Sequence, residues 1–341
     1  MDQYKIISDN GQGLFAERLT GLYDSVKRYL EAEQRQQRQL RYTKVFLSDI
    51  SNQEDELRQS PLMTELIGKA AYYTIIQQSP IGGAKIGLLL KTSDESEAFT
   101  MHSLRLTDDE VMNFGSYMQT VMLFDKYIAL LEAEGLNLKD HCVRTWLYVR
   151  DIDTNYDGVV KARNDIFRQH GLTVDTHFIA STGIGGRAKG KNVCVAIDFL
   201  TARDIQPEDK LYLKALDHLN PTHEYGVAFE RGVRITLPTK YEYFISGTAS
   251  INHLGEVINV GNVTKQTERL LENISALLAD GEATMADVKY FIVYLRDLAD
   301  QQAVDDYMEK AFPDVPRIIT HAKVCRPAWL VEMECIAERS R

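Results

Sequence analysis

QTERLLENISALLADGEATMADVKYFIVYLRD, residues 266–297, places an amphipathic helix directly before a strand. Its apolar residues recur every three or four positions, the spacing of one helix face: Leu270, Leu271, Ile274, Leu277 and Leu278. Gly281 stands where a helix usually ends, and the β-branched and aromatic run 288–295 is typical of a buried strand. The stretch therefore predicts a helix that packs on a sheet.

The same order of features occurs earlier in the chain. Gln119-Thr120 and the later Tyr148-Asp151 segment match Gln266-Thr267 and Tyr294-Asp297. The offsets are 147 residues (266 − 119) and 146 residues (294 − 148), so the two copies differ by a gap of a single residue in the loop around Gly135 or Gly281. A self-similarity of this kind predicts two tandem copies of one structural unit.

The elements around the quoted stretch define the expected unit. A hairpin of strands 241–251 and 256–260 precedes it, and a helix at 304–312 and strands at 318–324 and 330–335 follow. The order ββ-α-β-α-ββ predicts an α+β fold, a mixed sheet with two helices packed on one face. The N-terminal copy is predicted from strands 84–90, 142–148 and 192–199 and helices 109–135 and 157–171, with extra elements before it that include strand 42–47.

Three proline positions mark the expected domain boundaries. Pro207, Pro221 and Pro238 break regular structure between the copies. We therefore expect an N-terminal unit with extra elements at 1–205, a connector at 206–240 and a C-terminal unit at 241–341.

Composition excludes several classes of protein. Hydrophobic residues make up 44% and charged residues 26%, as in ordinary globular domains. A net charge of −10 and a pI near 5.4 argue against nucleic acid as a partner, and the basic segment 35–41 is typical of a solvated helix face. The four cysteines form no C-x-x-C pair, so neither a disulfide framework nor a zinc site is indicated. No apolar run reaches the roughly 20 residues of a membrane span, and we expect a cytoplasmic protein.

The C-terminal copy resembles the YjgF/Rid family, also called endoribonuclease L-PSP-like. The resemblance rests on FISGTAS at 244–250, VPR at 315–317 and LVEMECIA at 330–337, together with the helix and strand quoted above. It implies that Arg317 binds a substrate carboxylate, that Glu332, fifteen residues later, is catalytic, and that Gly247 lines the site. A guanidinium can grip a carboxylate with two hydrogen bonds, and a strand carboxylate at a pocket wall can move a proton. Without the resemblance, a surface ion pair and a solvated strand residue would be the simpler interpretations.

The N-terminal copy lacks these groups. Ala196 stands opposite Glu332 when the final strands of the copies are aligned. In place of the arginine is the glycine-rich loop 180–187, in which Thr182 and Gly183 could help to cradle an anion, although such loops are also ordinary turns. The sequence therefore predicts a composite site, in which Arg317 and Glu332 face this loop.

A wider resemblance, from about residue 43 to the end, is to the chorismatase family, in which two YjgF-like units are fused. It rests on the segments FLSDISNQ (46–53), QQSPIGGAKIGLLL (77–90), RTWLYVRDI (144–152), ARNDIF (162–167), ASTGIGG (180–186) and VCRPAWLVEME (324–334). It implies that Glu332 protonates the enolpyruvyl ether of chorismate or a related small unsaturated acid, that Cys325 steers the ring product, and that Arg163 and Tyr225 contact substrate. Residues 220–231 keep only part of the family's Tyr- and Pro-rich segment.

The sequence leaves two other functions open. The first is a Rid-type deaminase of 2-imino acids, and the second is a protein that binds a small carboxylate without catalysis. All three hypotheses involve a small-molecule carboxylate and imply no metal or organic cofactor. By analogy with trimeric YjgF domains, the chain is expected to form a homotrimer or an internal pseudo-trimeric arrangement.

Overall fold

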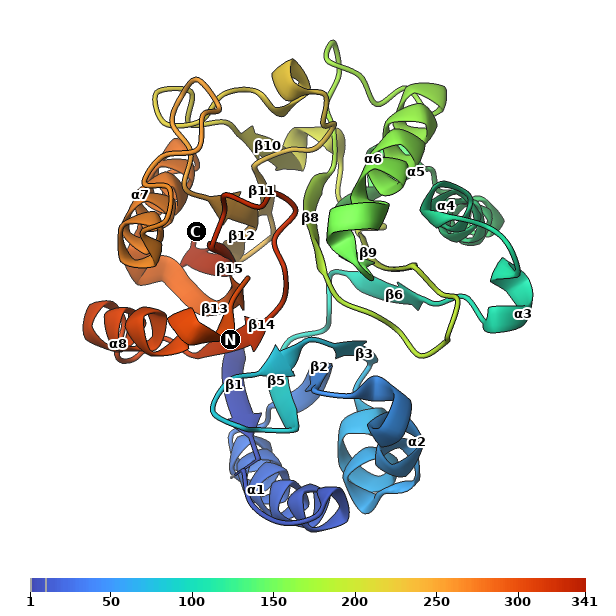
Figure 1. Cartoon of the computed structure of the whole chain (residues 1–341), viewed down its shortest axis with the longest axis vertical. Helices are drawn as coiled ribbons and strands as arrows, with labels where there is room; N and C mark the ends of the chain where they lie inside the picture. Colours follow the sequence, from blue (N-terminus) through green and yellow to red (C-terminus); the bar gives the residue numbers. More distant parts are fainter. Residues whose placement is uncertain (1, 10) are drawn as a thin grey trace.

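The computed structural model describes residues 2–9 and 11–341, and within them the chain forms three sheets around a common centre with the long helices outside (Figure 1). The first unit contains β1 (Gln3–Ser8), α1 (Phe15–Arg35), β2 (Gln39–Leu47), α2 (Ile50–Gln59), β3 (Tyr72–Gln77) and β5 (Ile86–Ser93). The middle unit contains β6 (Thr100–Leu104), α3 (Asp108–Val111), α4 (Ser116–Ala133), α5 (Leu138–His141), β7 (Cys142–Val149), α6 (Ile152–Gln169), β8 (Ala180–Gly185) and β9 (Val195–Thr201).

The third unit includes two strands that precede its repeated core. It contains β10 (Lys210–Leu213), β11 (Gly232–Thr236), β12 (Lys240–Ala249), α7 (Val263–Asp280), β13 (Val288–Leu295), α8 (Gln301–Ala311), β14 (Arg317–His321) and β15 (Val331–Ser340). Its sheet has the order β10-β11-β12-β15-β13-β14-β4, in which β4 (Ser79–Pro80) comes from the first unit. Short helical turns lie between these elements, among them Leu62–Leu66, Ile67–Lys69 and Thr222–Tyr225.

The three units share one strand order. The sheets read β1-β5-β2-β3, β6-β9-β7-β8 and β12-β15-β13-β14, and each has one parallel pair joined through a helix. A parallel pair needs such a crossover connection, and the helix between its strands covers the outer face. The predicted α+β class with two tandem mixed-sheet units is confirmed. The extra N-terminal elements form the first unit, which has the same strand order as the other two.

Four details differ from the sequence predictions. Strand 84–90 belongs to the sheet of the first unit, and β6 is the first strand of the middle unit. The expected connector supplies β10 and β11, which pair with the third sheet, because its prolines lie in turns and leave the residues between them free to pair. The helix expected at 109–135 is interrupted between α3 and α4, and the second arm of the expected hairpin is only the bridge Ile251–Val257.

The inner faces of the sheets pack on one another at the centre. Phe46, Tyr148 and Tyr294 occupy equivalent positions in the three units and are fully buried. The bridges Gln77–Arg187 and Ile184–Val324 join the first unit to the middle one and the middle one to the third. The chain therefore contains an internal pseudo-threefold arrangement, in which each unit forms a cleft with its neighbour.

Ion pairs fasten the N-terminus to the C-terminal sheet. Asp2 lies 3.0 Å from Lys91 Nζ and 2.7 Å from Lys240 Nζ, and the Tyr4 hydroxyl donates to Glu338 at 2.9 Å. These contacts close the ring of three units. No helix in the described part of the chain is long and apolar enough to cross a membrane.

Candidate active site

A cavity of about 520 Å³ lies between the middle and third units. Its walls come from α6 and β8 of the middle unit, from the segment before β11, and from β12, β15 and the loop between β14 and β15 of the third unit. Five residues predicted from the sequence meet here: Arg163, Gly183, Gly247, Cys325 and Glu332. Glu332 and β8 of the middle unit therefore line one cavity, whereas Arg317, the other predicted member of the composite site, is not among its lining residues; the roles of all these residues stay predictions.

Glu332 lies on β15, between Ala249 of β12 and Tyr294 of β13. Only 4% of the residue is exposed to solvent. Burial, and then the charge of Glu334, raise the pKa of Glu332 to about 8, against the opposing charges of Arg144 and Arg231. Because a buried carboxyl group favours its neutral form, Glu332 is protonated at neutral pH and can donate a proton.

Gly247 lies against the carboxyl group of Glu332. It falls in the irregular stretch of β12 between Ile245 and Thr248, and a Cβ added at this position would overlap Glu332 Oε1. A glycine is therefore required here because the backbone approaches the acid closely.

Cys325 lies beside both Glu332 and Tyr156 in the same cavity. Burial, and then the charge of Glu332, raise its pKa to about 12. The group is therefore a neutral thiol at physiological pH, and a neutral thiol is a poor nucleophile. A neutral thiol can still shape the wall against which a product forms.

We expect Cys325 to react slowly with iodoacetamide at pH 8. Its thiolate fraction should be on the order of 10³-fold below that of a free cysteine, because the thiolate is the reactive form. Mass spectrometry of the peptide that contains Cys325 would measure the rate, with Cys194, which is partly exposed like Cys325, as the internal comparison. Modification at the rate of a free thiol would contradict the assignment of a neutral thiol.

Two buried arginines give the cavity a cationic wall. Arg163 of α6 is 2% exposed and Arg231, just before β11, is 7% exposed. Their guanidinium carbons lie 5.9 and 5.4 Å from the centre of the Phe229 ring. Guanidinium groups are the side chains best suited to hold a carboxylate, so this wall suits an anionic ligand.

Residues 222–229 cover one side of the cavity and are held by α6. The side chain of Asn164 donates to Gly226 O at 2.9 Å and accepts from Ala228 N at 3.2 Å. Thr222 closes the segment on itself by donating to Phe229 O at 2.6 Å. Tyr225, predicted to contact substrate, belongs to this segment, but its side chain lies outside the described part of the structure.

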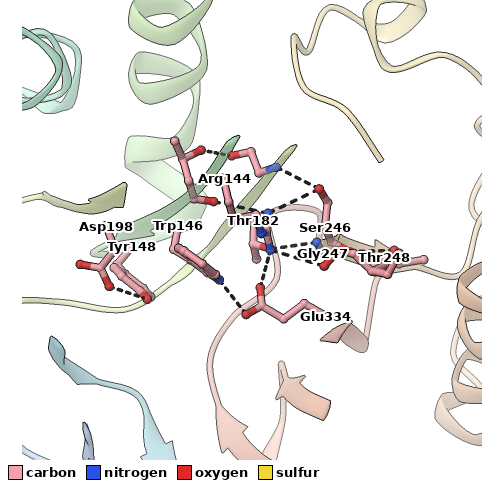
Figure 2. A network of polar contacts seen from close by, with 12 residues as sticks. Arg144, Trp146, Tyr148, Thr182, Asp198, Ser246, Gly247, Thr248 and Glu334 are labelled. Atoms are coloured by element: carbon pink, nitrogen blue, oxygen red, sulfur yellow. Dashed lines mark hydrogen bonds and ion pairs between the residues drawn. The ribbon is translucent and has the colours of Figure 1, made fainter. Parts of the chain in front are cut away.

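Thr182, which was predicted to help hold an anion, does not line the cavity and lies behind its wall. The loop is strand β8, and the Thr182 hydroxyl accepts a hydrogen bond from Gly247 N at 2.8 Å (Figure 2). It also contacts Arg144 and Glu334, which sequence reasoning missed. A charged residue inside the apolar strand sequence CVRTWLYV is the signal that could have identified Arg144.

Arg317 is not brought to Glu332. It is the first residue of β14, pairs with Asp305 at 3.2 Å and Glu309 at 2.5 Å on α8, and lines a separate cavity of about 410 Å³ beside β1. The physical reason is the strand order, in which β13 separates β14 from β15. Arg317 therefore faces the first unit, whereas Glu332 faces the middle unit.

The other two clefts lack the carboxyl group. Glu332 pairs with Tyr294, and the equivalent positions opposite Tyr148 and Phe46 are Ala196 and Gly87. Both of these clefts hold cavities, lined by Arg317 in one case and by β3 and β6 in the other. The acid of this position is thus confined to the cleft between the middle and third units.

Comparison with known proteins places the third unit in a family. Residues 233–339 match the family model described as Endoribonuclease L-PSP. The chain is 33% identical over 97 residues to a RutC family protein of Pyrococcus abyssi, and this alignment covers 28% of the chain and 76% of that protein. It is 27% identical over 96 residues to the 3-aminoacrylate deaminase RutC of Acinetobacter baylyi, with the same coverage of each protein.

A solved structure matches the whole chain. The crystal structure of a chorismatase aligns with a TM-score of 0.69 at 19% identity and covers 99% of this chain and 98% of that one. At this identity the match shows a common fold, and it includes the first unit and the strands before β12. Together with the family model and the Pyrococcus relative, the fold of three similar units leads to one conclusion: the chain belongs to the endoribonuclease L-PSP family, in a tandem form with the fold of a chorismatase.

Proposed function

We propose that this protein cleaves the enolpyruvyl ether of chorismate, or of a related small unsaturated carboxylic acid, with Glu332 as general acid. The observation that carries the proposal is a buried carboxyl group, neutral at pH 7, in a cavity that is also lined by the buried arginines Arg163 and Arg231. An acid that stays protonated beside an anion-binding wall suits proton transfer to a carboxylate substrate.

The reaction can be written with these groups alone and one water molecule. Glu332 gives its proton to the methylene carbon of the enol ether, and the carbon that carries the ether oxygen becomes an oxocarbenium ion. Water adds at that carbon, Glu332 takes up the proton released, and the resulting hemiketal separates into pyruvate and the ring alcohol. Arg163 and Arg231 would hold the substrate carboxylates, and the neutral thiol of Cys325 would contact the ring and influence which product forms.

The direct test is a product assay with the purified full-length chain. Chorismate is added, pyruvate is followed by coupling to lactate dehydrogenase, and the ring product is identified by chromatography. We expect one pyruvate for each chorismate consumed. The absence of pyruvate release, under conditions in which the protein remains folded, would sink the proposal.

A second candidate is the deamination of a reactive 2-imino acid or enamine. It is favoured by the match to a 3-aminoacrylate deaminase and by the same buried acid, which could equally protonate an enamine carbon. Ammonia release from an enzymatically generated 2-imino acid, faster with the protein than without it, would support this candidate. Tight binding of chorismate without either product would indicate a carboxylate-binding protein.

A further inference from the structure

A buried ionic network surrounds Glu334, and the proposed reaction does not use it (Figure 2). Its centre is Glu334, two residues after Glu332 on β15. Side chains two residues apart on a strand point to the same face, so both acids face the middle unit. Arg144, Trp146 and Thr182 of that unit reach Glu334.

Each oxygen of Glu334 has a donor from the middle unit. Arg144 Nη2 lies 3.0 Å from Glu334 Oε2, the Thr182 hydroxyl donates to the same oxygen at 2.5 Å, and Trp146 Nε1 donates to Oε1 at 2.8 Å. Arg144 is 1% exposed and Glu334 3% exposed. A buried ion pair offsets its desolvation only when its polar atoms are matched in this way, so the arrangement fixes both side chains.

The network also reaches the backbone that faces Glu332. The oxygen of Thr182 accepts from Arg144 Nη2 at 2.5 Å and from Gly247 N at 2.8 Å while its proton goes to Glu334. A hydroxyl group has one proton and two lone pairs, so its hydrogen-bonding capacity is fully used. Gly247 is the residue whose backbone lies against Glu332. The strand that carries Glu332 and the backbone at Gly247 that lies against its carboxyl group are therefore both held by the hydrogen-bond network around Glu334.

We propose that Glu334 is a positioning residue for Glu332: the middle unit holds it through Arg144, Trp146 and Thr182, and its fixed negative charge keeps Glu332 a carboxylic acid. The use of that acid rests on the proposed function, whereas the coupling between the two glutamates does not.

The charges around Glu332 agree with this role. After burial, the charge of Glu334 is the largest cause that raises the pKa of Glu332 to about 8. Titratable and charged groups from the surrounding elements also act with or on Glu332: Glu334, Arg144, Arg231, Cys325, Tyr156 and Tyr294. With Glu334 neutral, the two arginines would stabilise ionised Glu332, and its pKa should fall.

The pseudo-symmetry of the chain supplies a matched control. Asp198 occupies in the middle unit the position of Glu334, because it pairs with Trp146 as Glu334 pairs with Ile292. It is buried and ion-paired with Arg105 at 2.8 Å, but Ala196 stands two residues before it. Asp198→Asn therefore removes a comparable buried charge away from the Glu332 position.

The test measures the protonation of Glu332 itself. Infrared difference spectra between the full chain and its Glu332→Gln variant identify the carboxylic acid band of Glu332, and its amplitude is followed against pH. We expect a midpoint near pH 8 in the parent. Glu334→Gln should lower it by about one pH unit or more, and Asp198→Asn should leave it within about 0.3 units.

A second variant keeps the test decisive if Glu334→Gln does not fold. Trp146→Phe removes only the indole donor that holds Glu334 Oε1 and should move the midpoint by a smaller amount than Glu334→Gln does, because one of the contacts that position Glu334 is lost. An unchanged midpoint in the folded variants, or an equal fall in Asp198→Asn, would overturn the proposal. A midpoint that falls as expected in a protein that releases no pyruvate would instead refute the proposed function alone.

Discussion

Replacing Glu332 with glutamine should lower kcat for pyruvate release by about 10²- to 10⁴-fold, the usual contribution of a general acid. Glutamine has nearly the same shape, but its amide group is not acidic enough to donate a proton at neutral pH. Since Arg163 and Arg231 stay in place, the dissociation constant for chorismate should change by no more than about threefold. Steady-state kinetics and calorimetric titration with chorismate would measure the two quantities.

The matched control for this prediction is Glu338→Gln. Glu338 is also a buried glutamate of β15, and burial, then the charge of Glu242, raise its pKa to about 7, but it lies beside Lys240 and Tyr4, away from the cavity. Its variant should keep kcat within about threefold of the parent, because the residue contacts no part of the cavity. If Glu332→Gln retained kcat within tenfold of the parent in a protein that releases pyruvate, another group would have to supply the proton.

The protonated state of Glu332 also sets the pH range of the reaction. With a pKa of about 8, the acid is available at neutral pH and is lost as the pH rises through 8. In the parent, kcat/KM, whose pH profile reports the unliganded enzyme, should therefore be constant below the pKa and decline above it. The residual rate of Glu332→Gln should not follow this decline, so the pH profile separates loss of the acid from general damage to the site.

The fold could be predicted from the sequence where apolar spacing is regular. The helix and strand at 266–297 and their repeat near 119–151 were found because the inner faces of both copies need the same side chains. The first unit could not be identified as another copy, because Phe46 and Gly87 stand where the other units have tyrosine and either glutamate or alanine. None of the residues that reveal the repeat recurs there. Strand order depends on burial pattern rather than on particular residues, and it survives such changes.

The site was predictable only for residues carried by short motifs. Gly247, Cys325 and Glu332 lie in segments that fold together in the third unit, and Arg163 lies in a segment with its own resemblance. The side of the sheet that Arg317 faces depends on the order β15-β13-β14, which no local pattern gives. The pair of Arg144 and Glu334 joins residues 190 positions apart, so local spacing could not reveal it.

Glu332→Gln should also stabilise the protein increasingly as the pH rises. The pKa of Glu332 is about 8 in the folded chain, against 4.5 for an unperturbed glutamate. Below pH 4.5 both states are protonated and the residue has no pH-dependent effect. Between 4.5 and 8 the unfolded chain loses this proton while the folded chain keeps it, so the parent loses stability relative to the variant, by about 3 kcal/mol at pH 7.

Urea unfolding of both proteins at pH 4.5, 6, 7 and 8 would measure this difference in the free energy of unfolding. The pH dependence of all other groups is shared and cancels, so only the slope of the difference reports on Glu332. A difference that does not change with pH would mean that Glu332 ionises in the folded protein as it does in the unfolded chain. The acid would then be unavailable at neutral pH for enol ether or enamine alike, because the cost in stability and the capacity to donate a proton have the same origin in the burial of this carboxyl group.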